Sequence, residues 1–202
     1  MFKKLSILCA ALLMMATPAA AETAVTTGQQ APDFEFTDTY GQSHKLSDFQ
    51  GNPVVLEWSN HACPFVVKHY ESGNMQKLQK AAATENVTWL TIVSSAEGKQ
   101  GFTTADGANK IVEEHGAQPT YKTLDSSGEI GQLYGAKTTP HMFVIDKDGI
   151  LVYQGAIDDN NSHKISTVEG AHNYVTAALE SLKSGAPVEA SETRPYGCGV
   201  KY

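Results

Sequence analysis

The sequence predicts an α/β protein: a mixed central sheet flanked by helices, with an N-terminal β-hairpin extension. The first half of the chain alternates strand and helix patterns, which is typical of parallel strands joined by helices. The second half has two apolar runs around a tight-turn sequence and then a helical stripe, which indicates an antiparallel pair. The 202 residues are 41% hydrophobic and 18% charged, without repeats, so we expect one folded domain.

The first 21 residues have the pattern of a secretory signal peptide. Two lysines precede an apolar run over residues 5–15, and small residues lead to a predicted cleavage point after Ala21. An apolar run of about a dozen residues is too short to cross roughly 30 Å of hydrocarbon, so we expect no membrane anchor after cleavage. Cys9 leaves with the leader. The prediction is a periplasmic or secreted protein, with residues 22–30 as a flexible lead-in.

The chain without this leader is acidic, with 13 basic and 22 acidic residues. Such a surface repels phosphate backbones and has no basic stripe, so nucleic acid is not expected as a partner. No glycine pattern typical of nucleotide binding occurs, so we expect no flavin or nicotinamide cofactor.

The strands of the first half follow from alternation and apolar runs. Residues 34–36 and 44–46 alternate around a glycine turn and predict the hairpin, and residues 46–49 read as a turn. Residues 54–58 form an apolar run suited to a strand buried on both faces. Residues 87–94 are β-branched and predict a second strand.

Helices are expected after each of these two strands. Pro64 fits the first position of a helix, where its missing N–H costs nothing. The pair Gly73-Asn74 predicts a kink or stop, with Asn74 as cap of a second segment. Residues 105–115 predict another helix, which Gly116 ends.

The rest of the domain is predicted as a strand, a helical turn, two hairpin strands and a final helix, over residues 120–124, 129–134, 141–146, 150–155 and 173–184. The predicted domain therefore spans residues 31–185. Residues 186–202 form a C-terminal tail that carries Cys198.

Two cysteines remain after cleavage, Cys63 and Cys198, in a compartment where disulfides persist. Cys63 lies between a buried strand and Pro64, so we expect it at the N-cap of the helix, in an exposed turn. Unpaired N–H groups and the helix dipole favour a thiolate at that position. The alternative is a half-cystine whose location is incidental.

Pro140 begins a predicted strand, a position that a sheet normally excludes. A cis Thr139-Pro140 bond at the sheet edge, facing Cys63, explains it. The alternative is an ordinary trans turn proline.

At these features the sequence resembles the redoxin and peroxiredoxin-like branch of the thioredoxin-fold superfamily, over residues 28–185. The resemblance rests on four stretches: residues 28–34, residues 46–56, the pair Cys63-Pro64, and residues 134–146. It implies a thioredoxin-like fold, an active-site cysteine at Cys63 and a cis Pro140 against it.

The chain departs from the motifs of its apparent relatives. The second cysteine of a Cys-x-x-Cys pair is replaced by Val66. The proline and threonine of a peroxiredoxin site are replaced by Leu56 and Asn60, and Arg194 in the tail is the only arginine of the sequence. The pattern resembles the peroxiredoxin-like subgroup that has one cysteine, at the first Cys-x-x-Cys position.

Cys198 supplies a possible second thiol, because Gly197 and Gly199 let its backbone approach another element closely. Our hypothesis is that Cys198 docks on Cys63 and acts as its resolving cysteine. The rival is a structural Cys63–Cys198 clasp, worth about 5 kcal/mol from loop entropy, in a non-catalytic binding or folding module.

Supporting residues are expected around Cys63. His61 precedes it in the turn, and Trp58 ends the predicted strand before that turn. Thr139 and His141 are the residues on either side of Pro140. We interpret His69, in the helix after Cys63, as a polar surface residue; the role of Lys68 beside it stays open.

A copper or zinc site is the third interpretation, formed by Cys63, His61 and His141 with Met142 or Met75. No tight ligand spacing supports it, so we expect no metal. We interpret residues 158–161 as a solvated turn, because they lack the glycine and distal glutamate of a calcium loop.

The sequence therefore predicts an exported thiol-dependent oxidoreductase of peroxiredoxin-like type, with antioxidant activity as a related role. Cys63 attacks a disulfide or peroxide of a protein or small molecule, Cys198 resolves the product, and an unidentified thiol reductant completes the cycle. Peroxide is the less favoured substrate.

Overall fold

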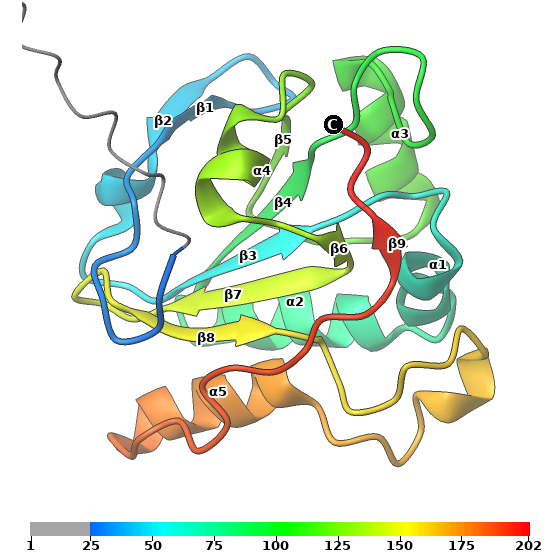
Figure 1. Cartoon of the computed structure of the whole chain (residues 1–202). Helices are drawn as coiled ribbons and strands as arrows, with labels where there is room; N and C mark the ends of the chain where they lie inside the picture. The colour runs from blue at the N-terminus through cyan, green and yellow to red at the C-terminus, as the bar shows by residue number, and fades with distance from the viewer. Residues whose placement is uncertain (1–24) are drawn as a thin grey trace, which may run out of the picture.

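The computed structural model describes residues 25–202 (Figure 1). The predicted leader and residues 22–24 of the lead-in lie outside these residues, whereas Gly28 and Gln30 of the lead-in are bonded to the chain beside β8. Within the described part, no helix has both the length and the apolar character needed to span a membrane.

The centre of the fold is a five-stranded mixed sheet with the order β5-β4-β3-β7-β8. β3, β4 and β5 are parallel, while β7 is antiparallel to β3 and β8 is antiparallel to β7. The strand bounds are β3 Val54–Trp58, β4 Thr88–Val93, β5 Tyr121–Leu124, β7 His141–Ile145 and β8 Leu151–Gly155. Every strand of this sheet was predicted from the sequence, as was its mixed character.

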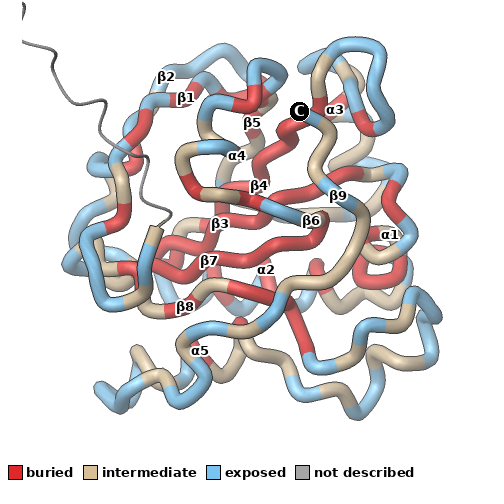
Figure 2. The backbone as a smooth tube through the Cα atoms, viewed as in Figure 1, coloured by how far each residue is buried: buried red, intermediate tan, exposed pale blue. Residues whose placement is uncertain are grey.

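Apolar side chains alternate along the strands and form one core on each face of the sheet. The central strands of the sheet are buried along most of their length (Figure 2, red). Val55 belongs to the first core, which packs against α1 (Pro64–Glu71), α2 (Asn74–Thr84) and α5 (Tyr174–Ser184). Leu56 belongs to the second core, which packs against the hairpin and α4 (Glu129–Tyr134). The hairpin strands are β1 Glu35–Thr37 and β2 Ser43–Lys45. α3 (Ala105–Glu114) follows β4.

Two local predictions need correction. The stop at residues 73–74 is present, but Gly73 is the cap of α2, because it adopts the left-handed φ of 73°. Asn74 lies inside the helix, and its side chain contacts His69 instead. The turn after β2 is a short 3-10 helix, η1 (Leu46–Phe49); a second one, η2 (Ile165–Thr167), was not predicted.

The C-terminal segment crosses one end of the sheet as an ordered strap, residues 191–202 (Figure 1, red). Within it, β9 (Cys198–Gly199) pairs antiparallel with β6 (Thr138–Thr139), directly before Pro140. Further bridges join Glu192 to β8 and Lys201 to the end of β4. Neither β6 nor β9 was predicted, because two residues carry no periodicity.

Candidate active site

Cys63 is the N-cap residue of α1, as predicted. Its backbone is extended, Pro64 occupies the first turn, and the Cys63 carbonyl accepts the N–H groups of Val66 and Val67 at 2.9 Å. The thiol therefore lies at the positive end of a helix that starts directly after the central strand β3.

The Thr139-Pro140 peptide bond is cis and lies against Cys63, as expected. The Cys63 thiol donates a hydrogen bond to the Thr139 carbonyl at 3.0 Å. The Thr139 hydroxyl is buried beside the Cys63 sulfur, and within residues 25–202 no other group forms a hydrogen bond with it.

Cys198 reaches the same position from the opposite end of the chain. β9 places Cys198 opposite Thr139 in the pairing with β6, and the two thiols are in hydrogen-bonding contact. Both cysteines are free thiols in this structure. The expectation of an exposed Cys63 is wrong: its exposed fraction is 0%, because the strap lies over it.

The two thiols differ in acidity. Burial opposes ionisation of Cys63, but hydrogen bonds to its sulfur from Cys198 and Thr139 outweigh burial and lower its pKa. Burial, together with the neighbouring Cys63, raises the pKa of Cys198 to about 11. Of the two thiols, Cys63 is therefore the one that loses its proton at the lower pH.

Two predicted supporting residues lie on the other side of the sheet. Trp58 packs in the second core and donates to the Ser94 hydroxyl at 3.0 Å. The ring of His141 lies 4.4 Å from that of Phe143, tilted by 46°, in the same region, and burial lowers the pKa of His141 to about 3. The alternation of β3 and β7 turns both side chains away from the face that carries Cys63.

His61 lines a hollow together with His115 and Lys122. Burial, with smaller contributions from Lys122 and His115, lowers the pKa of His61. The structure therefore does not gather Cys63, His61 and His141 into one site. Within the described residues, no three His, Cys, Asp or Glu side chains form a metal-binding group.

Sequence reasoning missed a buried carboxylate, Glu57, in the middle of β3. Its oxygens accept hydrogen bonds from Tyr70 at 2.8 Å, Trp89 at 2.9 Å and Thr91 at 3.0 Å. The signal was a single acidic residue inside an apolar run, which in a doubly buried strand requires polar partners.

A second missed group lies beneath the strap, and we name its four side chains the Tyr196 cluster: Lys68, His69, Asp158 and Tyr196. The interpretation of His69 as a surface residue is wrong, because its side chain is fully buried and burial lowers its pKa to about 3. The interpretation of residues 158–161 as a solvated turn is wrong for Asp158, because this residue is only 2% exposed.

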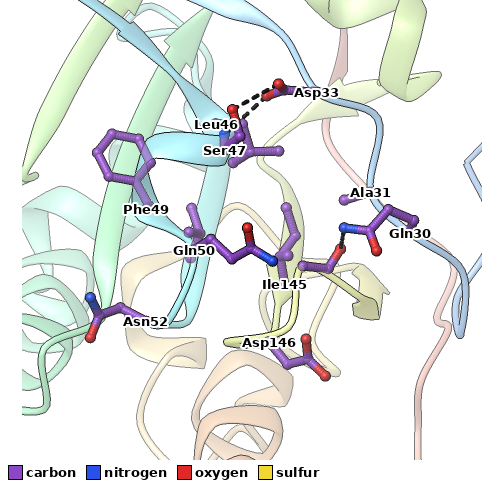
Figure 3. A pocket seen from close by; sticks show the side chains of 12 residues that line it. Gln30, Ala31, Asp33, Leu46, Ser47, Phe49, Gln50, Asn52, Ile145 and Asp146 are labelled. Carbon is purple, nitrogen blue, oxygen red and sulfur yellow. Dashed lines mark hydrogen bonds between the residues drawn. The ribbon is translucent and has the colours of Figure 1, made fainter.

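A small pocket elsewhere on the molecule has no part in this chemistry (Figure 3). It is lined by η1, the start of β3 and the β7–β8 turn, so it lies at the end of β3 opposite Cys63. Its walls are held by Asp33, which accepts from Ser47, and by Gln30, which donates to Gly149 (Figure 3).

Comparisons with known proteins agree with this fold. The thiol-disulfide oxidoreductase ResA of Geobacillus kaustophilus is 29% identical over 124 residues, covering 55% of this chain and 71% of the relative. ResA of Geobacillus thermodenitrificans is 30% identical over 129 residues, covering 63% and 68%.

Solved structures give the same fold. An uncharacterized conserved protein from Geobacillus kaustophilus has a TM-score of 0.76 at 27% identity, covering 88% of this chain and 92% of its own. A putative thiol:disulfide interchange protein DsbE from Chlorobium tepidum has a TM-score of 0.53 at 24% identity, covering 65% and 85%. The Redoxin family model matches residues 26–172. Because this match spans most of the described chain and the fold is thioredoxin-like, the protein belongs to the redoxin family.

Proposed function

We propose that this protein is an exported thiol-disulfide oxidoreductase in which Cys63 is the nucleophile and Cys198 the resolving cysteine. The observation that carries the proposal is the contact of the two thiols at the N-terminus of α1, beside the cis Pro140. The relatives named thiol-disulfide oxidoreductases support the same class of chemistry.

The reaction proceeds by two thiol–disulfide exchanges. The Cys63 thiolate attacks one sulfur of a substrate disulfide, forms a mixed disulfide and releases the first substrate thiolate. Cys198 then loses its proton and attacks the Cys63 sulfur, which releases the second substrate thiolate and leaves a Cys63–Cys198 disulfide. Two electrons pass to the substrate, and a thiol reductant returns them to the pair.

Disulfides are better substrates than peroxides on this proposal. A peroxide site needs groups that hold the oxygen atoms, and the peroxiredoxin positions for them carry Leu56 and Asn60. Cys198 could also resolve a sulfenic acid formed on Cys63 by a peroxide. Because the groups that hold a peroxide are replaced, we expect peroxide reduction to be the slower side reaction.

The proposal includes the organisation predicted from the sequence. The leader of residues 1–21 is removed, the protein is periplasmic or secreted, and the redox unit is the domain of residues 31–185 with its tail. The mass of the protein recovered from the producing cell tests the cleavage point after Ala21.

Equilibration in glutathione buffers tests the redox assignment. We expect a reversible Cys63–Cys198 disulfide, and a Cys198→Ser variant that accumulates a mixed disulfide at Cys63. A Cys63–Cys198 bond that resists mild reductants, in a protein whose reduced form melts far lower, indicates the structural clasp instead.

A further inference from the structure

The Tyr196 cluster joins the strap to the body of the protein through buried charges. The Tyr196 hydroxyl donates a short hydrogen bond to the Asp158 carboxylate. Lys68 lies 3.9 Å from that carboxylate, donates to the Asn160 carbonyl at 2.8 Å and lies 5.0 Å from the centre of the Tyr196 ring. His69 lies 3.3 Å from the hydroxyl.

This anchor acts directly on the cysteine pair, because Tyr196 is two residues before Cys198. The intervening Gly197 packs against the backbone of Thr139. The strap covers Cys63, so any substrate reaches that sulfur only when the strap moves away. After the mixed disulfide forms, the same strap has to return before Cys198 attacks.

The strap has a second and weaker anchor at its end. The Tyr202 hydroxyl donates to the Ala136 carbonyl at 2.8 Å, but this acceptor is neutral and Tyr202 is 41% exposed. A hydrogen bond to a buried charged group contributes more than one to a neutral group at the surface. Of the two tyrosine anchors, Tyr196 therefore contributes more to docking near Cys198, while Thr193 and the bridges at Glu192 and Lys201 hold other parts of the strap.

We infer that Tyr196 is a positioning residue for the redox reaction: its bond to Asp158 keeps the strap closed over Cys63 and returns Cys198 to the mixed disulfide. The inference rests on the proposed function. It assigns to one hydroxyl two opposite effects, protection of Cys63 in the reduced protein and promotion of the resolving step.

The test is Tyr196→Phe, which keeps the ring and removes only the hydroxyl. Alkylation of Cys63 in the reduced protein, located by peptide mass spectrometry, is expected to accelerate about tenfold or more, because the loss of a hydrogen bond to a charged group raises the open fraction by that factor. In glutathione buffers, the ratio of Cys63–Cys198 disulfide to Cys63–glutathione mixed disulfide is expected to fall by a similar factor.

The matched control is Tyr134→Phe, which removes a buried hydroxyl that donates to the Pro32 carbonyl at 2.7 Å, away from the strap. It is expected to lower the melting temperature but to change neither measurement. Asp158→Asn should move both in the same direction as Tyr196→Phe, and the double variant should be less than additive.

Equal behaviour of Tyr196→Phe and wild type in either measurement overturns the inference, as does a control that changes as much. Failure of the proposed function gives a different result. In that case wild type itself forms no reversible Cys63–Cys198 disulfide with glutathione, whatever residue occupies position 196.

Discussion

Gly197 offers a sharp test of the docked strap, because its backbone leaves no room for a side chain. Its φ is 136°, a value that residues with a Cβ rarely adopt. A Cβ at this position would lie 2.8 Å from the carbonyl carbon of Thr139 and 3.3 Å from the nitrogen of Pro140. Because nonbonded carbons need about 3.5 Å, Gly197→Ala has to lift the strap by roughly 1 Å.

The cost of this change follows from what the strap loses. Strain at a positive φ costs about 1 to 3 kcal/mol, and each weakened β6–β9 hydrogen bond costs about 1 kcal/mol. A total of about 2 to 4 kcal/mol corresponds to roughly a thirtyfold to thousandfold larger open fraction. We expect Cys63 of Gly197→Ala to be alkylated faster by a factor in this range.

The matched control is Gly199→Ala, on the other side of Cys198. The nearest atom to a Cβ there is the Lys137 carbonyl oxygen, at 4.0 Å, and φ lies outside the left-handed region. This variant should react within about threefold of wild type, since a change under 1 kcal/mol is expected. Equal acceleration in both variants, or none in Gly197→Ala, refutes the docking geometry.

Three further predictions concern the groups around the site. Thr139→Val removes the hydroxyl that donates to the Cys63 thiolate, so the pKa of Cys63 should rise; the pH dependence of its alkylation rate measures this, and an unchanged midpoint contradicts it. His69 and His141 are buried with pKa values lowered to about 3, so the unfolded chain binds more protons between pH 3 and 6.5. The free energy of unfolding should therefore be highest above pH 6.5 and fall as the pH decreases toward 3, by up to about 1.4 kcal/mol per pH unit for each histidine. Urea unfolding at a series of pH values measures this. Glu57→Gln places an amide among hydrogen-bond donors and should lower the unfolding free energy by about 2 to 4 kcal/mol, whereas Glu85→Gln, which removes an exposed ion pair, should change it by less than about 1 kcal/mol.

The sequence was sufficient for the features that depend on local patterns. The apolar run of β3, the alternation of the hairpin and the turn between β7 and β8 each carry their own signal, and all three elements are present. The position of Cys63 at the helix start and the cis bond before Pro140 were also predicted.

The remaining features depend on contacts between distant segments. Nothing near Tyr196 in the sequence indicates Asp158 as its partner, and the burial of His69 follows from a loop and a strap that cover it. The assignment of Trp58 to the site was avoidable. Neighbouring residues of a strand face opposite sides of the sheet, so Trp58 shares the face of Leu56, whereas Cys63 packs on the face of Val55.

Because Val66 stands where a Cys-x-x-Cys motif has its second cysteine, the two thiols of this protein come together at a different stage of folding. In a Cys-x-x-Cys pair both sulfurs belong to one helical turn and emerge from the ribosome together. Here the second sulfur follows Cys63 by 135 positions, so the two sulfurs meet only after the residues between them have been made and folded. A chain cut before the strap by a protease or by incomplete synthesis keeps Cys63 but loses both the segment that covers it and the second thiol.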